Sequence, residues 1–301
     1  MRIQHVPRAL ARSKVVIQGL SEHLYSRAVY ALASTCLPPV MLVPMLRAYC
    51  RFYRVNTDEL ALPFDSYSNF REFFSRPVRP GLRPIDAGPA RLTSPVDGDV
   101  LATGSFRNGP PETLRIKGKI YSLASLLGTS KVPDAFRSGG YVLFYLAPGD
   151  YHRIHSPMDG YVTAVDAIPG TCRPVNRIGR RFFPDLYVTN RRVVLWMRSD
   201  DEPALDAALV LIGAMGVGRI LVDLDGISIE ASKSDERHER FAEPVAVARG
   251  QEIGCFDLGS SALLVWSGDR CPTRILVKEG RVKVGECVVA KGDRARGEAD
   301  A

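Results

Sequence analysis

The sequence predicts an α+β fold in which a β-rich antiparallel sheet core follows a helical N-terminal region. From Leu92 onward, short apolar runs rich in β-branched and aromatic residues recur between Gly and Pro turn signals, a pattern typical of strands. Before about residue 64, the apolar residues form longer, helix-like stretches. With 301 residues and 46% hydrophobic content, the chain can bury a substantial core. We therefore expect a helical region over residues 1–63 and a β-rich domain over residues 64–301.

The main feature of the helical region is residues 28–46, which contain no charged residue over 19 positions. A stretch of that length could just span a bilayer. Pro38 and Pro39 fall near its middle and, with Pro44, argue against one straight helix, because each proline removes a backbone donor. The pattern predicts two helices separated by a break. They could lie in a membrane interface or pack as a buried hairpin on the main domain.

Charge favours the membrane interface for this region. Of the formal net charge of +7, residues 1–60 hold eight Lys and Arg against three Asp and Glu, a surplus of five. Arg47, Arg51 and Arg54 follow the apolar stretch at helical spacing, where they can meet lipid phosphates. No nucleic-acid partner is expected, because the basic residues are not interleaved with stacking aromatics. No secretory signal is visible either, so we expect a peripheral protein on the cytoplasmic face of the cell membrane.

Two further segments predict local helices. Residues 64–86 mix aromatic residues with Pro and Arg, which indicates a short helix running into an extended connector. Residues 119–128 indicate a helical insert among the strands, with Leu123, Leu126 and Leu127 on one face. The six cysteines contain no C-x-x-C pair and no His at ligand spacing, so neither a metal site nor a disulfide framework is predicted.

Three polar motifs interrupt the strand-rich region. They are "TSPVDGDV" with Asp97, "APGDYHRIHSP" with His152 and His155, and "DLGSSAL" with Ser260. Taken singly, each has an ordinary explanation as a turn, a surface histidine pair or a polar hairpin. Together they supply a nucleophile, a base and an orienting carboxylate. Ser260 lacks the second glycine of a G-x-S-x-G elbow and lies between strands, so an α/β-hydrolase is a poor fit.

The glycine before Ser260 suggests a different chemistry. A serine hydroxyl can attack the carbonyl of the preceding residue where the peptide is bent, and glycine tolerates the strained backbone that this requires. A base can then remove the serine α-proton from the resulting ester, which eliminates the upstream carboxylate and leaves dehydroalanine. Hydrolysis of that group leaves a ketone. Ser260 would thereby become a pyruvoyl group.

Seven blocks follow one another along the chain: "YSNFREFFSRPVRPGLRPID", "SPVDGDV", "IKGKIYSLASLLG", "LAPGDYHRIHSP", "VNRIGRRFFPDLYVTNRRVV", "LIGAMGVGRI" and "GQEIGCFDLGSS". In this order they resemble the bacterial-type, pyruvoyl-dependent phosphatidylserine decarboxylase proenzymes. The segment "YRVNTDELALP" extends the resemblance from these blocks toward the N-terminus, so that it covers about Tyr49 to Val289.

The resemblance implies self-cleavage between Gly259 and Ser260 into a β chain of residues 1–259 and an α chain of residues 260–301. The α chain would begin with the pyruvoyl group made from Ser260, and no dissociable cofactor would be needed. The implied reaction is decarboxylation of phosphatidylserine to phosphatidylethanolamine, in which the ketone serves as electron sink, as pyridoxal phosphate would. The resemblance also leads us to expect a homo-oligomer. Ser261 stands where many family members have Thr, which affects the expected cleavage rate.

The resemblance assigns roles to the four candidate catalytic side chains. Asp97, His155 and Ser260 would form the relay that drives self-cleavage, with Asp97 orienting the imidazole of His155. His152 would act later, as the acid that protonates the carbanion after carbon dioxide leaves.

The lipid phosphodiester needs a cationic partner, for which the sequence offers Arg153, Arg177 and Arg191 without a ranking. Three other functions stay open at this point. The protein could decarboxylate another serine-linked lipid, bind lipid as a scaffold that never cleaves itself, or bind nucleic acid.

Overall fold

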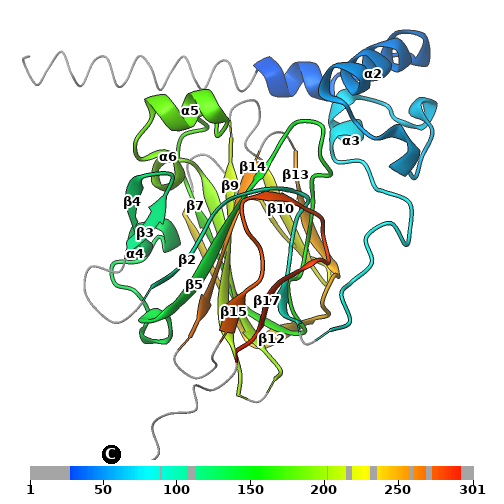
Figure 1. Ribbon diagram of the computed structural model, residues 1–301. Helices are drawn as coiled ribbons and strands as arrows, with labels where there is room; N and C mark the ends of the chain where they lie inside the picture. The colour runs from blue at the N-terminus through cyan, green and yellow to red at the C-terminus, as the bar shows by residue number, and fades with distance from the viewer. Residues whose placement is uncertain are drawn as a thin grey trace, which may run out of the picture.

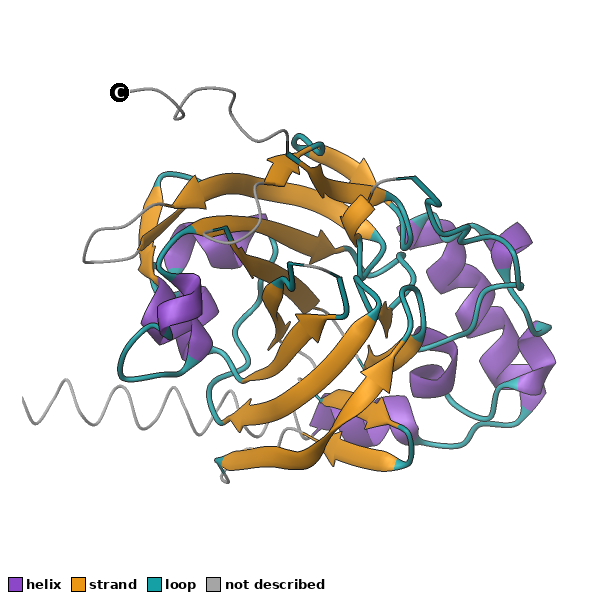
Figure 2. Cartoon of the chain, turned by 90° about the horizontal axis from the view of Figure 1, so that it is seen from below, coloured by secondary structure: helices purple, strands orange, loops and turns teal. Residues whose placement is uncertain are grey.

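The computed structural model describes residues 28–88, 90–106, 113–201, 203–214, 219–230, 236–257, 260–268 and 273–292. A strand-rich body carries the helical N-terminal region on one side, as Figures 1 and 2 show from two directions. All pairings between the named strands in these ranges are antiparallel. The predicted α+β class and antiparallel core are confirmed.

The N-terminal region consists of a helix over Ala28–Ser34 and helix α2 (Pro39–Tyr53), bent by 118° relative to each other. Pro38 is extended and caps α2, while Pro39 occupies its first turn, where a missing N–H costs nothing. The predicted helix, break and second helix are therefore confirmed. Among the described residues, no single helix is long and apolar enough to cross a membrane; only this bent pair reaches the required length and composition together.

Helix α2 buries one face and exposes another. Leu42, Leu46 and Cys50 pack against Tyr67 and Phe73 in a small core. The other elements of this region are η1 (Thr57–Glu59), η2 (Phe64–Ser66) and α3 (Phe70–Phe74), followed by the predicted extended connector. The exposed face of α2 carries the apolar side chains of Val40, Met41 and Phe52.

The main sheet has eight strands, and its central strands are buried on both faces. In β14, Ala262, Leu264 and Trp266 join one hydrophobic cluster, whereas Leu263 and Val265 join the cluster on the opposite face. This period of two explains why the strands read as continuous apolar runs. In spatial order the strands are β12 (Arg237–Val247), β7 (Gly160–Ile168), β8 (Arg192–Ser199), β9 (Asp206–Gly213), β14 (Ser260–Ser267), β5 (Gly139–Leu146), β2 (Gly98–Phe106) and β16 (Gly280–Val282).

Two smaller sheets contribute to the cluster that contains Trp266. Their apolar side chains pack on one face of the main sheet, which makes this side of the molecule a layer of sheet on sheet. The four-stranded sheet has the order β11 (Ile227–Glu230), β10 (Ile220–Leu224), β13 (Glu252–Phe256) and β6 (Arg153–His155). The three-stranded sheet has the order β1 (Ala90–Thr93), β17 (Cys287–Lys291) and β15 (Thr273–Ile275).

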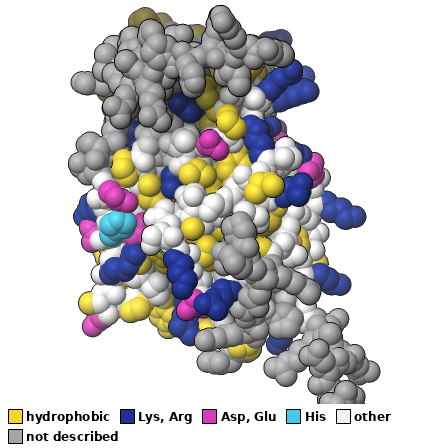
Figure 3. All heavy atoms as spheres, turned by 90° about the vertical axis from the view of Figure 1, so that its left-hand side faces the viewer, with side chains coloured by type: hydrophobic (Ala, Val, Ile, Leu, Met, Phe, Trp, Pro, Cys, Tyr) yellow, Lys and Arg dark blue, Asp and Glu magenta, His cyan; other side chains and the backbone are white. Residues whose placement is uncertain are grey.

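Short helices and a hairpin cover the opposite face of the main sheet, on the left in Figure 1. On this side, Lys and Arg are spread among hydrophobic and acidic side chains, as the coloured atoms of Figure 3 show. The elements are β3 (Thr113–Ile116), β4 (Lys119–Ser122), α4 (Leu123–Leu127), η3 (Asp134–Phe136), α5 (Arg177–Phe182) and α6 (Leu186–Thr189).

The prediction of a helical insert over residues 119–128 was only half right. The first four residues form β4, because Lys117 and Gly118 adopt positive φ and turn the chain back onto β3. Helix α4 begins after Ser122, whose hydroxyl accepts a hydrogen bond from the amide of Ser125. Leu123, Leu126 and Leu127 are fully buried on one face, as predicted.

Candidate active site

Ser260 is the first residue of β14 and lies between two neighbouring strands. Its register partners are Leu146 at the end of β5 and Gly213 at the end of β9. The side chain is fully buried, and its Oγ has no hydrogen-bond partner among the described residues. Gly259, the other residue of the predicted cleavage site, lies outside the described residues.

The side chain of Ser260 lies on the face of β14 that the smaller sheets cover. Because side chains alternate along β14, Ser260 shares its face with Ala262, Leu264 and Trp266, the face covered by the four-stranded sheet. Ser261 faces the opposite cluster. Strands β6 and β13 contribute to the cluster on the Ser260 side. The geometry therefore favours Ser260 over Ser261 as the residue that faces the segment containing His152 and His155, which we call the histidine segment.

Two backbone connections place the histidine segment near Ser260. Strand β5 ends at Leu146, the register partner of Ser260, and the chain then loops through residues 147–152 into β6. On the other route, β6 pairs with β13, and the amide of Phe256 donates to the carbonyl of His152 at 2.9 Å. Phe256 precedes Ser260 by four positions. The fold thus brings together two predicted site segments that are far apart in the sequence.

His152 is fully buried and held in one tautomer. Its Nδ1 lies 2.8 Å from the carbonyl oxygen of Asp150, which can only accept, so Nδ1 carries the proton. Its Nε2 is buried without a partner among the described residues, and its ring lies 4.0 Å from the ring of Phe74. Burial and, after it, the positive charge of Arg76 together lower the pKa of His152 to about 3. His152 is therefore neutral at neutral pH, with a free lone pair on Nε2.

His155 uses both ring nitrogens. Nδ1 donates to the carbonyl oxygen of Gly250 at 2.8 Å, and Nε2 accepts from the hydroxyl of Tyr151 at 3.0 Å. Burial lowers the pKa of His155, although the Gly250 carbonyl and the charge of Glu252 act in the opposite direction. A neutral imidazole in this setting can accept a proton, as the base of a self-cleavage reaction must.

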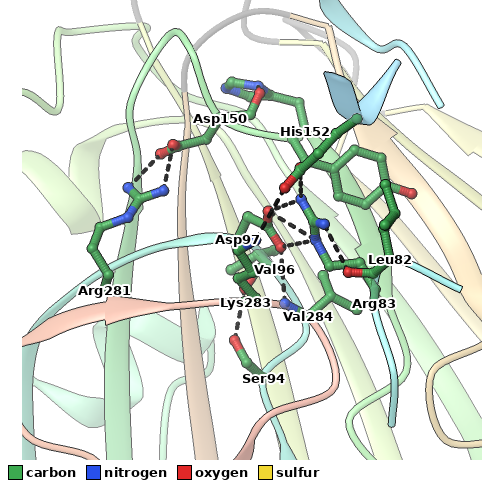
Figure 4. Close-up of polar contacts among 12 residues, drawn as sticks. Leu82, Arg83, Ser94, Val96, Asp97, Asp150, His152, Arg281, Lys283 and Val284 are labelled. Carbon is green, nitrogen blue, oxygen red and sulfur yellow. Dashed lines mark hydrogen bonds and ion pairs between the residues drawn. The ribbon is translucent and has the colours of Figure 1, made fainter. Parts of the chain in front are cut away.

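Asp97 binds Arg83 and not His155. Arg83 donates to Asp97 through Nε, at 2.9 Å from Oδ1, and through Nη2, at 2.6 Å from Oδ2. The amide of Val284 adds a third donor at 2.9 Å, and Figure 4 shows these contacts converging on the carboxylate. These partners are distant in sequence, so Asp97 does more than hydrogen-bond the backbone of its own Pro-Val-Asp-Gly turn. The charged, forked guanidinium is a stronger partner for a carboxylate than a neutral imidazole is.

The expected contact from Asp97 to His155 is replaced by an indirect one. The guanidinium carbon of Arg83 lies 5.6 Å from the centre of the Tyr151 ring, and Tyr151 holds His155 through its hydroxyl. Sequence reasoning missed both Arg83 and Tyr151 as members of the site. Each stands inside a block that carries the family resemblance, but only the fold shows that they connect Asp97 to His155.

The three arginines considered for the lipid phosphodiester occupy different places. Arg153 lies on β6 next to His152, but it pairs with Glu252 at 2.8 Å. Arg177 is exposed at the start of α5, which packs on the other face of the main sheet. Arg191 is buried just before β8. Of the three, only Arg153 adjoins the histidine segment, and its charge is already balanced.

Comparisons with known proteins show the family of this chain. The family model for phosphatidylserine decarboxylase matches residues 70–290. A phosphatidylserine decarboxylase proenzyme from Anaeromyxobacter is 37% identical over 272 residues, covering 89% of this chain and 94% of that protein. Proenzymes of the same name from Myxococcus xanthus and Brevibacillus brevis are 36% and 32% identical, covering 75% and 82% of this chain and 78% and 87% of their own lengths. The chain therefore belongs to the phosphatidylserine decarboxylase family.

Proposed function

We propose that this protein decarboxylates phosphatidylserine to phosphatidylethanolamine with a pyruvoyl group made from its own Ser260. Self-cleavage between Gly259 and Ser260 would give a β chain of residues 1–259 and an α chain of residues 260–301. The observation that carries this proposal is the buried hydroxyl of Ser260, which has no hydrogen-bond partner among the described residues and lies on the face of β14 toward the histidine segment, in a chain of this family. A buried polar atom without a partner is costly, and a reactive role explains why it is kept.

In the proposed self-cleavage, His155 takes the proton of the Ser260 hydroxyl. The oxygen then attacks the carbonyl carbon of Gly259, the C–N bond breaks, and the freed amine takes up a proton, which leaves an ester. Removal of the α-proton of Ser260 expels the carboxylate of Gly259, and hydrolysis of the resulting dehydroalanine releases ammonia. The neutral state of His155 supports this role. Its lone pair is on Nε2, which accepts a hydrogen bond from Tyr151, so Nε2 would take the proton as Tyr151 releases it. Asp97 acts as a positioning residue through Arg83.

The buried hydroxyl of Ser260 fits a pyruvoyl group, since that group replaces the same side chain on the same backbone. Once formed, the pyruvoyl ketone supplies the electron sink for loss of carbon dioxide. The role proposed for His152 is to take up a proton at Nε2 from the substrate's ammonium group and to deliver it after carbon dioxide leaves. Its Nδ1 is fixed by the carbonyl of Asp150, so proton exchange is confined to Nε2. The wall formed by Phe74 supports the exclusion of water from that nitrogen.

The proposal also places the protein on the cytoplasmic face of the cell membrane as a peripheral enzyme. Helix α2 exposes Val40 (79%), Met41 (59%) and Phe52 (78%), an apolar face that water alone does not favour. Arg47 and Arg51 are exposed on the same helix. Apolar side chains beside basic ones suit the interface of an anionic bilayer, where the substrate resides.

The first test is an intact mass spectrum of the purified protein under denaturing conditions. We expect two fragments that meet between residues 259 and 260, the smaller with a ketone-reactive N-terminus. The cleaved protein should release carbon dioxide from vesicles that contain phosphatidylserine. A single species of about 33.1 kDa would overturn self-cleavage and leave a lipid-binding scaffold. Cleavage with activity only on a different serine-linked lipid would overturn the substrate.

A further inference from the structure

Arg76 is a buried cation without a matching anion. It follows α3, and only 4% of it is exposed. Its Nη2 donates to the backbone carbonyls of Gly149 and Asp150 at 2.7 and 3.0 Å, while its Nη1 is buried without a hydrogen-bond partner among the described residues. None of the ion pairs found in the described part of the chain includes it. The two carbonyls and the ring of Phe73, whose centre lies 5.2 Å from the guanidinium carbon, compensate this buried charge only in part. A buried cation without an anion is unfavourable, which suggests that a ligand supplies the missing anion.

Arg76 lines a cavity that carries excess positive charge. The cavity has a volume of about 270 Å³ and follows the loop at Gly149, Asp150 and Tyr151. Most of the other charged side chains in its wall are paired with one another. These pairs are Arg83 with Asp97 and Glu59, Lys283 with Glu59, and Arg281 with Asp150, the last of which is visible in Figure 4. The surplus comes from Arg76 inside and from the exposed Arg54.

Arg76 also touches the same backbone atom as His152. Nη2 of Arg76 and Nδ1 of His152 both donate to the carbonyl oxygen of Asp150, at 3.0 and 2.8 Å. Two donors on one acceptor must lie within a few ångströms of each other. A ligand group bound at the free Nη1 of Arg76 would therefore lie next to the imidazole assigned to the decarboxylation step.

We propose that Arg76 binds the phosphodiester of the serine phospholipid headgroup and so positions the headgroup beside His152. This inference rests on the proposed function and names the residue that recognises the substrate's phosphate. Arginine suits that role, because its planar fork matches phosphate oxygens. It differs from Arg153, Arg177 and Arg191, which the sequence suggested for the same task.

The phosphodiester is a better ligand for Arg76 than the substrate's carboxylate is. The carboxylate loses its negative charge as carbon dioxide forms, so a cation held against it would stabilise the substrate more than the transition state and slow the reaction. The phosphodiester keeps its charge from binding to product release. Its interaction with Arg76 is then equal in substrate and transition state, and loss of it should raise KM more than it lowers kcat.

The test compares Arg76→Gln and Arg76→Lys with Arg79→Gln, after mass spectrometry has shown complete self-cleavage. Arg79 is a matched control, since it lies on the same connector, is exposed, and loses the same charge. The substrate is dihexanoyl phosphatidylserine below its micelle concentration. We expect Arg76→Gln to raise KM by about 10- to 100-fold, as for loss of a charged hydrogen bond, with a smaller change in kcat. Arg76→Lys should lie in between, and Arg79→Gln within about twofold of the wild type.

Competition separates phosphate recognition from a purely structural role. Glycerophosphoethanolamine should inhibit the wild type more strongly than ethanolamine does, and Arg76→Gln should abolish that difference. Equal inhibition of the wild type by both compounds would overturn the inference, as would an unchanged KM in a fully cleaved Arg76→Gln protein.

If Arg76→Gln fails to cleave, binding of glycerophosphoethanolamine is compared by NMR between Ser260→Ala and the Ser260→Ala, Arg76→Gln double variant. Loss of binding in the double variant supports the inference, and equal binding overturns it. A wild type that releases no carbon dioxide from phosphatidylserine would instead overturn the proposed function itself.

Discussion

The polar atoms around Asp97 are paired with one another, whereas several of those around Ser260 and His152 have no hydrogen-bond partner among the described residues. Around Asp97, Arg83 donates to two carboxylates and Lys283 donates to one of them, so the charges are matched before any ligand arrives. Around Ser260 and His152, three polar atoms are buried without a hydrogen-bond partner among the described residues: Oγ of Ser260, Nε2 of His152 and Nη1 of Arg76. The first arrangement fixes the fold. The second leaves lone pairs and donors available at a free-energy cost of about 1–3 kcal/mol for each atom.

The largest effect is expected when the hydroxyl of Ser260 is removed. We expect Ser260→Ala to abolish self-cleavage and leave a single species of about 33.1 kDa in a denaturing mass spectrum. Because the hydroxyl has no hydrogen-bond partner in the described part of the chain, its loss should leave the free energy of unfolding unchanged or slightly higher. Ser261→Ala is the matched control, since Ser261 is equally buried but faces the opposite cluster. Cleavage that survives in Ser260→Ala and stops in Ser261→Ala would reverse the assignment.

Removing one charge on the Asp97 side should cost stability. Asp97→Asn leaves the guanidinium of Arg83 with one carboxylate fewer in a nearly closed environment, where the side chains of Arg83 and Asp97 are 7% and 5% exposed. We expect the free energy of unfolding to fall by about 3 kcal/mol, as for a broken buried ion pair. Urea denaturation in the uncleaved Ser260→Ala background measures this change. Asp134→Asn, which breaks an exposed pair with Arg137, should change it by less than about 1 kcal/mol; similar losses in both variants would contradict the comparison.

The pH dependence of the free energy of unfolding tests whether His152 is buried in its neutral state. The pKa of His152 is about 3 in the folded protein and about 6.5 in an unfolded chain, so the unfolded state binds more protons between these values. Stability from His152 is therefore present above pH 6.5 and is lost as the pH falls. At pH 5 the loss should reach about 2 kcal/mol, and His152→Gln in the Ser260→Ala background should lack it. The two proteins serve as mutual controls between pH 7 and 8, where their difference should be constant. An identical slope below pH 6.5 would show that His152 is not buried in a neutral state.

The sequence allowed prediction of most strands and of the proline break, because each has a local signal. Pro38 and Pro39 interrupt a helix wherever they occur. Apolar runs between turn residues predict buried strands, and β14 is buried throughout its length. Residues 119–122 were missed as a strand, because they pair with β3 through a turn whose residues, Lys117 and Gly118, have positive φ.

The partners within the site could not be predicted, because they depend on the fold. The residue that binds Asp97 was expected to be His155, and it is Arg83, since a guanidinium offers a carboxylate two charged donors. The isolation of Arg76 is likewise invisible in the sequence, where it is one of many arginines. The fold shows that Arg76 is 4% exposed, that its Nη1 has no hydrogen-bond partner among the described residues, and that it shares the carbonyl of Asp150 with His152.

The smallest expected effects concern the helical N-terminal region, where an apolar face is exposed and not buried. Substituting Arg47 and Arg51 together by Gln should weaken binding to vesicles of phosphatidylcholine and phosphatidylglycerol, since each basic residue near an anionic surface contributes about 1 kcal/mol. The expected decrease is roughly 10- to 30-fold, measured by sedimentation with the vesicles. The matched control is Arg177→Gln with Arg181→Gln on α5, which removes the same charge from exposed positions on another helix. An equal decrease in both double variants would mean that net charge, and not α2, governs attraction to the membrane, because only a local contact depends on which helix carries the arginines.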